Sequence, residues 1–265
     1  MKDFISIGHL FQHGMLVLLL ITARIAPVVQ MVPYLGGKAT PQSVKTTIAF
    51  ALSGLIFPVV WTSDVLPTGF GMALLIAKEA MVGLTMGFIG ALVFEAIRIA
   101  GQIIDTARGQ NMATALVPQL PDRSSVTGDA LYLLFVAIFL VSGAHHLLLT
   151  VLLRSYIAVP ISRFPDMDQI SDVGMLVARL FGNSFELALV IAFPVVLTVL
   201  MADVVLAMVN RAAPQVQVFF LGMPLKAALG LFVVLLCVEG IMQRLMQQGV
   251  EDISALQTII EGWAE

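Results

Sequence analysis

The sequence predicts an all-α membrane protein built from hydrophobic helical hairpins with broken helices. Of its 265 residues, 59% are hydrophobic and only 12% are charged, and the mean hydropathy is +0.98. A soluble domain is closer to half apolar and a quarter charged. A net charge of −3 argues against a nucleic-acid partner. The chain therefore buries its apolar surface in a membrane or against partner proteins.

Six apolar runs organise the chain, and no strand pattern or internal repeat interrupts them. They lie near residues 10–23, 47–61, 69–94, 130–153, 185–209 and 216–242. A full membrane span needs about 20 apolar residues, so the third to sixth runs qualify and the first two are short. We expect an amphipathic helix at 168–184, an exposed polar C-terminal helix at 243–265, and a single domain over 1–265.

Residues 210–226 place charges and prolines between the last two apolar runs. An unpaired backbone group in hydrocarbon is costly, so a broken helix at membrane depth survives only against protein or a water-filled cavity. This segment therefore predicts a part of an assembly or a pore wall. The residues that carry this prediction are Asn210, Arg211, Pro214, Gln215, Phe219, Pro224 and Lys226.

Several ionisable residues lie inside or at the ends of the apolar runs, where they are expected to face protein or water. Lys78 and Glu79 are adjacent and point about 100° apart on a helix, so we expect no direct pair between them and a separate partner for each. Asp203 and Asn210 share a helix face. That face predicts either a proton relay or a hydrogen bond to a neighbouring helix.

A polar stripe closes the third run, where Glu95, Arg98, Gln102 and Asp105 follow one another at spacings of three or four. It predicts either a solvated pore or subunit seam, or a helix end leaving the membrane with ion pairs at the interface. Earlier on the same helix, Gly83, Gly87 and Gly90 have the spacing that permits close helix contact, between subunits or within the chain.

The connection 105–128 is longer than most links between helices, and long links are often functional. It mixes Gly109 and Pro118 with the apolar residues Met112, Leu116 and Val117. Such a loop suits a plug, which must seal by dry contact and still withdraw. The alternative is a loop lying on lipid headgroups.

No pattern in the sequence indicates catalysis. The nucleophile motifs, phosphate-binding loops and metal-ligand spacings that enzymes use are incomplete here. We therefore expect a non-enzymatic protein with no catalytic residues, no cofactor and no metal site. An ion-coupled secondary transporter that uses the intramembrane carboxylates Glu79, Glu95 or Asp203 is the alternative function.

The motif residues together resemble the FliR/SctT family of export-gate subunits of flagella and type III secretion systems. The resemblance is strongest in Asn210–Gln215, in Val218–Phe219 and in Pro224–Lys226. Further matches lie at Arg24 and Pro27, at Lys78–Glu79, and at Ser155–Tyr156 with Pro160. The pattern around Arg108–Gly109 and Ser124–Ser125 looks more like injectisome members than flagellar ones. A departure occurs at Val117, where family members often carry Asp or Asn before the proline.

The resemblance implies a core subunit of the export gate in the bacterial inner membrane, within the basal body and raised toward the periplasm. Its implied partners are SctR-like (FliP-like) and SctS-like (FliQ-like) subunits, an SctU-like (FlhB-like) switch protein, and the unfolded proteins that are exported. The plug implied by the family comprises Arg108, Gly109, Met112, Ala113, Leu116, Val117 and Pro118. The residues assigned to subunit packing are Lys78, Glu79, Glu95, Arg98, Asp203, Asn210, Arg211, Pro214, Gln215, Phe219, Pro224 and Lys226.

Overall fold

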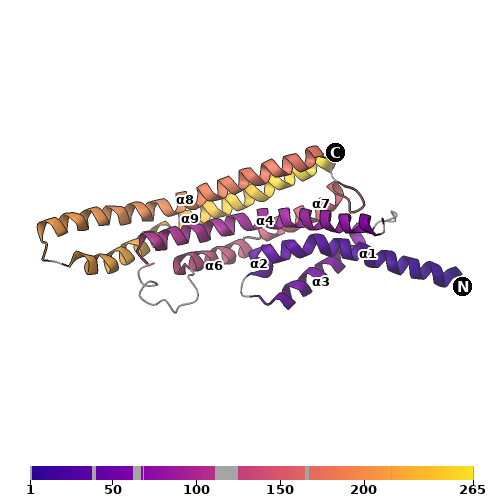
Figure 1. The fold of residues 1–265 in the computed structure, drawn as a ribbon, viewed down its shortest axis with the longest axis horizontal. Coiled ribbons are helices and arrows are strands. Elements are labelled where there is room, and N and C mark those ends of the chain that lie inside the picture. Colours follow the sequence, from indigo (N-terminus) through magenta and orange to yellow (C-terminus); the bar gives the residue numbers. More distant parts are fainter. Residues whose placement is uncertain are drawn as a thin grey trace. The chain divides into compact units, whose positions relative to one another are not determined.

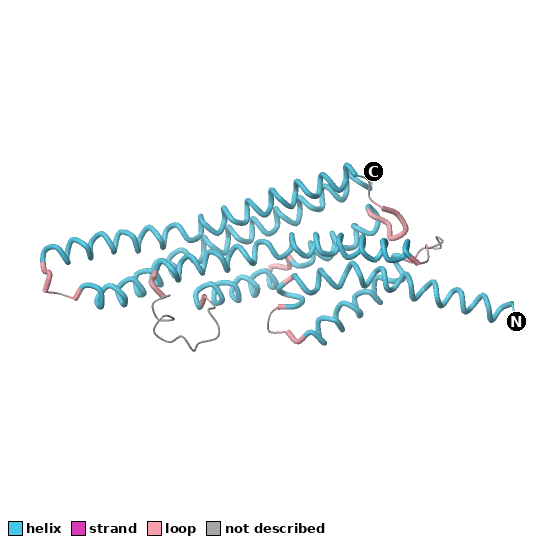
Figure 2. The backbone as a smooth tube through the Cα atoms, in the orientation of Figure 1, coloured by secondary structure: helices cyan, strands magenta, loops and turns pink. Residues whose placement is uncertain are grey.

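The computed structural model is helical throughout the residues that it describes, which are 2–37, 40–61, 67, 69–110, 125–164, 167–215 and 217–264 (Figure 1). Among these residues no strand occurs, and the loops are short links between helices (Figure 2). The all-α prediction is therefore confirmed. The helices are α1 (Lys2–Met31), α2 (Pro33–Gly36), α3 (Gln42–Val60), α4 (Phe70–Ala107), α6 (Val126–Val141), α7 (His145–Ala158), α8 (Met167–Ala212) and α9 (Val218–Ala264).

Length and composition make five of the described helices long and apolar enough to cross a membrane. They are α1, α3, α4, α8 and α9, and the bent pair of α6 and α7 can form a sixth span. A helix rises 1.5 Å per residue, so even the 19 residues of α3 reach nearly across the hydrocarbon core. The predicted membrane class is confirmed, and the first two runs are longer as helices than their apolar cores suggested.

Two predicted boundaries are wrong because helices continue through them. The amphipathic segment 168–184 and the fifth run form one helix, α8, of 46 residues. The tail 243–265 continues α9 and is not fully exposed, because Ile253, Leu256 and Ile260 are buried along one face. Their spacing of three and four residues is the pattern of a helix that packs on one side.

The fourth run, predicted as one span over 130–153, is instead broken into α6 and α7. The chain turns at Gly143, whose φ is +77°. Glycine adopts this left-handed conformation readily because it lacks a Cβ atom. The prediction of broken helices is thus correct for this run, although the break falls where no proline stands.

The break between α8 and α9 is shorter than the predicted interruption at 210–226. α8 includes Arg211 and ends at Ala212, and α9 begins at Val218 and contains Pro224 and Lys226. A proline inside a helix costs one backbone hydrogen bond and crowds the preceding turn, but neighbouring helices can compensate for this in a membrane protein. α8 and α9 therefore form a long helical hairpin with a tight turn.

The contacts divide the chain into two compact units. Unit 1 comprises Met1–Leu92, Leu140–Leu180 and Gly249–Glu265, and unit 2 comprises Val93–Phe139 and Phe181–Gln248. The helices α4, α8 and α9 each continue from one unit into the other. The single-domain organisation over 1–265 stays a prediction.

Unit 1 is built on a very close contact between α1 and α4. A Cβ atom at Gly83 would lie 2.0 Å from the backbone oxygen of Arg24, and one at Gly87 would lie 3.0 Å from the Cα atom of Val28. The glycine spacing on α4 therefore serves close helix packing within the chain. Within unit 1, the α1 side chains of Leu20, Ile21 and Ile25 are fully buried.

Unit 2 packs α4 against α6 through aromatic rings and a second glycine contact. The ring of Phe94 lies 5.0 Å from that of Phe135 and 5.3 Å from that of Phe139, distances typical of favourable aromatic pairs. About two turns further along α4, a Cβ atom at Gly101 would lie 2.1 Å from the Cα atom of Gly128. The two helix backbones touch at this point.

The helices differ sharply in how much of their apolar surface the chain itself covers. In the most apolar stretch of α4, 61% of the residues are buried, against 22% in α8 and 17% in α9. The exposed side chains of α8 and α9 include Phe181, Phe193, Phe220 and Phe232. The hairpin of α8 and α9 thus leaves most of its apolar surface to lipid or to other proteins.

Candidate functional site: polar contacts of the predicted plug and turn

Unit 1 contains a buried cluster of charges around Glu79, which we call the Glu79 cluster and which comprises Arg24, Lys78 and Glu79. The Arg24 guanidinium donates from Nε to Oε2 of Glu79 at 2.5 Å and from Nη2 to Oε1 at 2.9 Å. The Lys78 ammonium lies 2.6 Å from Oε1 of the same carboxylate. All three residues are buried. The prediction that Lys78 and Glu79 do not pair is therefore wrong, because the flexible four-carbon stem of lysine lets its ammonium reach across the helix surface.

Arg24 connects α1 to the C-terminal end of α7. Its Nη1 donates to Oγ of Ser155 at 3.0 Å, and its Nη2 donates to the backbone oxygen of Val159 at 2.7 Å. Its guanidinium also lies over the ring of Tyr156, 4.1 Å from the centroid. A buried guanidinium is tolerated when its donors are satisfied in this way.

Lys78 holds the loop that follows α7. Its ammonium donates to the backbone oxygens of Pro160 and Arg163, both at 2.9 Å. The partners of Lys78 and Glu79 thus come from the same chain, and their predicted part in subunit packing stays a prediction. Sequence reasoning from charges missed Arg24 and Ser155, and only the family-like segments that contain them could have indicated their role.

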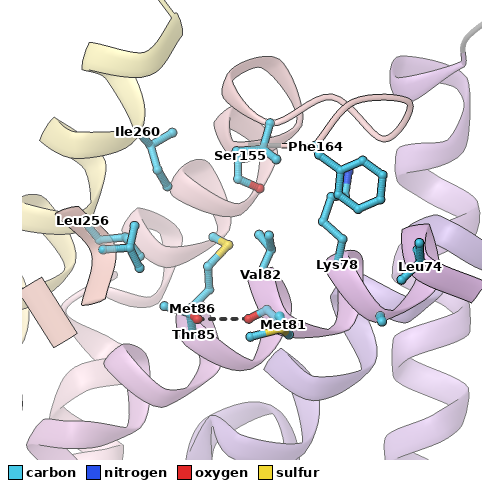
Figure 3. Close-up of a pocket in the computed structure, with 13 residues that line it drawn as sticks. Leu74, Lys78, Met81, Val82, Thr85, Met86, Ser155, Phe164, Leu256 and Ile260 are labelled. Atoms are coloured by element: carbon cyan, nitrogen blue, oxygen red, sulfur yellow. Dashed lines mark hydrogen bonds between the residues drawn. The ribbon is translucent and has the colours of Figure 1, made fainter. Parts of the chain in front are cut away.

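An apolar cavity of about 360 Å³ adjoins the Glu79 cluster within unit 1. Figure 3 shows Lys78 and Phe164 on one side of it, and Leu256 and Ile260 of α9 on the other. The size is typical of a small-molecule or side-chain pocket. The lining explains why the last turns of α9 are not exposed as predicted, since they form a wall of this cavity.

In unit 2, both helices that flank the predicted plug end in well-formed caps. α4 ends at Ala107 and is followed by Gly109, whose φ is +82° and whose N–H donates to the backbone oxygen of Thr106 at 3.1 Å. The N–H of Gln110 donates to the backbone oxygen of Asp105 at 3.1 Å. These two bonds and the left-handed glycine define a Schellman motif. Gly109, a predicted plug residue, is therefore part of the motif that ends α4 before the connection 111–124.

α6 begins with a serine cap. The Oγ of Ser125 accepts a hydrogen bond from the N–H of Gly128 at 2.8 Å, and its backbone oxygen accepts one from the N–H of Asp129 at 2.8 Å. Serine at this position satisfies an N–H group that has no partner within the helix. The connection between the two caps, 111–124, lies outside the described residues. It contains the predicted plug residues Met112, Ala113, Leu116, Val117 and Pro118.

Arg108 links the end of α4 to α6 and α9 within unit 2. Its Nη1 donates to Oγ1 of Thr127 at 2.9 Å, and its Nη2 donates to the backbone oxygen of Ala227 in α9 at 3.0 Å. Gly230 leaves room for this side chain, since a Cβ atom there would lie 2.6 Å from Cγ and Cδ of Arg108. The family resemblance implied that Arg108 belongs to a plug, which stays a prediction; in the structure its side chain lies against α9 at the end of α4.

The predicted polar stripe on α4 is divided between exposed and buried positions. Glu95 and Gln102 are exposed, whereas Asp105 is buried. Arg98 lies 3.7 Å from the Glu95 carboxylate and 3.8 Å from that of Asp129, and its guanidinium lies 4.3 Å from the centroid of the Tyr132 ring. All four residues of the stripe lie within α4, because this helix continues to Ala107 and does not end with the apolar run.

The α8–α9 hairpin carries an ion pair that the sequence analysis did not predict. Lys226 of α9 pairs with Asp203 of α8, and both side chains remain partly exposed. Asp203 therefore has a charged partner, whereas the sequence had related it to Asn210. With Arg108, Asn210 and Pro214 the pair lines a pocket of about 700 Å³ within unit 2. This pocket is far more polar than the cavity of unit 1.

Three further residues of the motif lie at the end of α8 or in the turn that follows it. Arg211, Pro214 and Gln215 are exposed in the isolated chain. Phe219 lies in α9, but its side chain is outside the described residues. Within the described part of the chain, no three His, Cys, Asp or Glu residues are grouped so that they could hold a metal ion.

A family model described as "Bacterial export proteins, family 1" matches residues 15–252, which is most of the chain. The chain belongs to this family, the FliR/SctT family. It is a membrane component of a type III export apparatus, an export-gate subunit, and the family is one of structural export components rather than known enzymes.

Relatives from flagella and from secretion systems are both similar to the chain. It is 30% identical over 222 residues to "Flagellar biosynthetic protein FliR" of Bacillus subtilis, covering 83% of this chain and 85% of the relative. It is 33% identical over 201 residues to "Yop proteins translocation protein T" of Yersinia pestis, covering 74% and 75%. It is 27% identical over 195 residues to "Secretion system apparatus protein SsaT" of Salmonella typhimurium, covering 72% and 74%. The assignment to the injectisome branch stays a prediction.

Proposed function

We propose that this export-gate subunit lines the channel for unfolded proteins and helps to close it. The observation that carries the proposal is the uncovered apolar surface of α8 and α9 in a chain of the FliR/SctT family. Such a surface is much larger than a soluble monomer tolerates, and it marks a site of protein or lipid contact. Exported chains pass through the gate, and other components supply the energy.

The proposed partners are SctR-like and SctS-like subunits, which cover the α8–α9 hairpin, and an SctU-like switch protein. The assembly lies in the bacterial inner membrane and is raised toward the periplasm. Two features favour burial among protein subunits over burial in lipid. The turn that follows α8, at 213–215, interrupts the apolar sequence, and the ion pair between Asp203 of α8 and Lys226 of α9 stays partly exposed. Both are costly against acyl chains and are tolerated against protein or water.

The first test of this function is removal of the proposed plug. We expect an assembled gate that lacks residues 111–120 to conduct ions several-fold better than the wild type, because an apolar constriction closes a pore by excluding water. The measurement is single-channel or bulk ion flux through purified gates in lipid bilayers. The deletion leaves Gln110 and Ser125 in place, so both helix caps are retained. A replacement of 111–120 by Gly and Ser residues of equal length is the control for connection length.

This control should leak as well, since it restores length without restoring apolar contact. Gates of equal conductance in all three forms, with normal assembly on native gels, would contradict the plug.

The exposed turn motif gives a second test, which separates folding from assembly. We expect Arg211→Ala and Pro214→Ala to change the free energy of unfolding of the isolated chain by less than about 0.5 kcal/mol, because both residues are exposed there. The same variants should reduce the yield of the complex with SctR-like and SctS-like subunits several-fold. Arg179→Ala, at another exposed arginine of α8, is the matched control. Normal complex yield for both variants would refute the assembly role of the turn.

A further inference from the structure

We propose that Asp105 is the positioning residue that clasps the two ends of the connection 111–124. We call Asp105, Arg108, Ser125 and Thr127 the helix-end clasp. The inference concerns the described helix ends on either side of the connection, and its importance for sealing the channel rests on the proposed function.

The carboxylate of Asp105 is where the two helix ends meet. Its Oδ2 accepts a hydrogen bond from Oγ of Ser125 at 2.7 Å and another from the N–H of Thr127 at 3.1 Å. Both donors belong to the start of α6, 20 and 22 residues further along the chain. The last turn of α4 thus directly holds the first turn of α6.

The other side of the carboxylate binds its own helix end. The Oδ1 of Asp105 lies 3.3 Å from Nη1 of Arg108. In the orientation of the Gln110 amide that satisfies both groups, its nitrogen would donate to the two carboxylate oxygens at 3.0 and 3.1 Å. Donors from both sides of the connection therefore converge on one buried group, only 5% of which is exposed.

Ser125 has two roles in this arrangement. Its hydroxyl donates to Asp105 while its oxygen accepts from the N–H of Gly128, so the cap of α6 is set by the carboxylate of α4. A buried carboxylate needs several donors to offset its loss of hydration, and charge-assisted bonds of this kind are stronger than neutral ones. Loss of the charge at Asp105 would therefore release the serine, the α6 backbone and Arg108 together.

Arg108 extends the clasp to α9. Because the same guanidinium contacts Asp105, Thr127 and the backbone oxygen of Ala227, a shift of α9 would be transmitted to both ends of the connection. Arginine suits this position because its planar guanidinium has several donors and can contact three acceptors at once. A lysine ammonium would hold the same acceptors less rigidly. The clasp thus ties the base of the proposed plug to the hairpin that packs against other subunits.

The test is hydrogen exchange measured by mass spectrometry on the assembled gate with full-length chains. Asp105→Asn keeps the size of the side chain but removes its charge and turns an NH₂ group toward donors. We expect amide exchange in segments 106–110 and 125–129 to accelerate by about tenfold, as expected for the loss of charge-assisted bonds. Exchange in 15–31 of α1, which lies in unit 1, should remain unchanged. Glu186→Gln, at an exposed carboxylate of α8, is the matched control.

Ser125→Ala provides an independent variant if Asp105→Asn does not assemble. It leaves both charges in place and should accelerate exchange at 125–129 more than at 106–110. Exchange at both helix ends equal to that of the wild type, or an equal rise over the whole chain, would overturn the clasp. A local rise in exchange together with a leak-free 111–120 deletion would support the clasp and refute the plug. The 111–120 deletion could leak while the Asp105→Asn gate stays ion-tight despite faster exchange at its helix ends. That result would refute the contribution of the clasp to sealing.

Discussion

Glu79→Gln is expected to destabilise the chain strongly. Glu79 is the only acidic member of the Glu79 cluster, and without it the buried charges of Arg24 and Lys78 lose the carboxylate that both of them contact. Removing one partner of a buried ion pair typically costs about 3–5 kcal/mol. That is a large share of the roughly 5–15 kcal/mol by which proteins are stable. The measurement is the yield of folded chain in detergent and the temperature midpoint of its unfolding.

Glu261→Gln is the matched control for this prediction. Glu261 pairs with Arg154 in the same unit, but the two side chains are 46% and 47% exposed. Exposed ion pairs contribute about 0–1 kcal/mol, so this variant should unfold close to the wild-type temperature. Equal losses of stability in the two variants would show that the cluster is not shielded from solvent in the way the structure indicates.

Replacing the whole cluster with apolar residues tests the origin of the stability that Glu79→Gln loses. The loss can come from the missing ion pairs or from the two charges that remain buried without their partner. The variant Arg24→Met, Lys78→Met, Glu79→Leu removes all three charges at once. Buried ion pairs can often be exchanged for apolar residues with little loss, because their desolvation cost disappears with them. We expect this variant to recover much of the stability that Glu79→Gln loses. The recovery should be incomplete, since the backbone oxygens of Val159 and Pro160 lose their donors.

The sequence indicated the fold class and the approximate place of every long helix, because hydropathy reports directly on burial in an apolar environment. It was less informative about where helices stop. Gly143 breaks an apolar run that was expected to form one span, whereas Pro224 lies within a helix that it was expected to interrupt. Backbone breaks depend on the partners available for the freed groups, and these partners come from distant parts of the chain.

The sequence could not predict which side chains pair with one another. The spacing of Lys78 and Glu79 indicated the directions in which their side chains leave the helix. It did not indicate that the long lysine side chain reaches the Glu79 carboxylate. The ion pair of Arg24 with Glu79 joins residues 55 positions apart, and the bond between Ser125 and Asp105 bridges the connection 111–124. The motif resemblance marked several of these residues without indicating which of them meet. The glycine spacing, in contrast, predicted close helix packing correctly, since the absence of a Cβ atom is a local property.

Gly101→Ala is expected to separate α4 from α6 and to destabilise unit 2. The new methyl group would lie 2.1 Å from the Cα atom and 2.5 Å from the nitrogen of Gly128, which are backbone atoms that cannot rotate away. Overpacking of a tight contact typically costs about 1–3 kcal/mol, and here the helices themselves have to move. The readout is the unfolding midpoint in detergent, together with hydrogen exchange at 125–129.

Gly182→Ala is the control, because it introduces the same methyl group inside α8, where nothing lies within 4 Å. At an open helical site alanine is expected to stabilise the chain by about 0.5–1 kcal/mol, since it restricts the unfolded chain more than glycine does. The two substitutions should therefore shift the unfolding midpoint in opposite directions. A shift of the same sign in both would mean that α4 and α6 do not touch at Gly128. The short distance between the helix ends on which the Asp105 clasp depends would then be absent too, because the glycine contact lies one turn from that carboxylate and brings Ser125 within its reach.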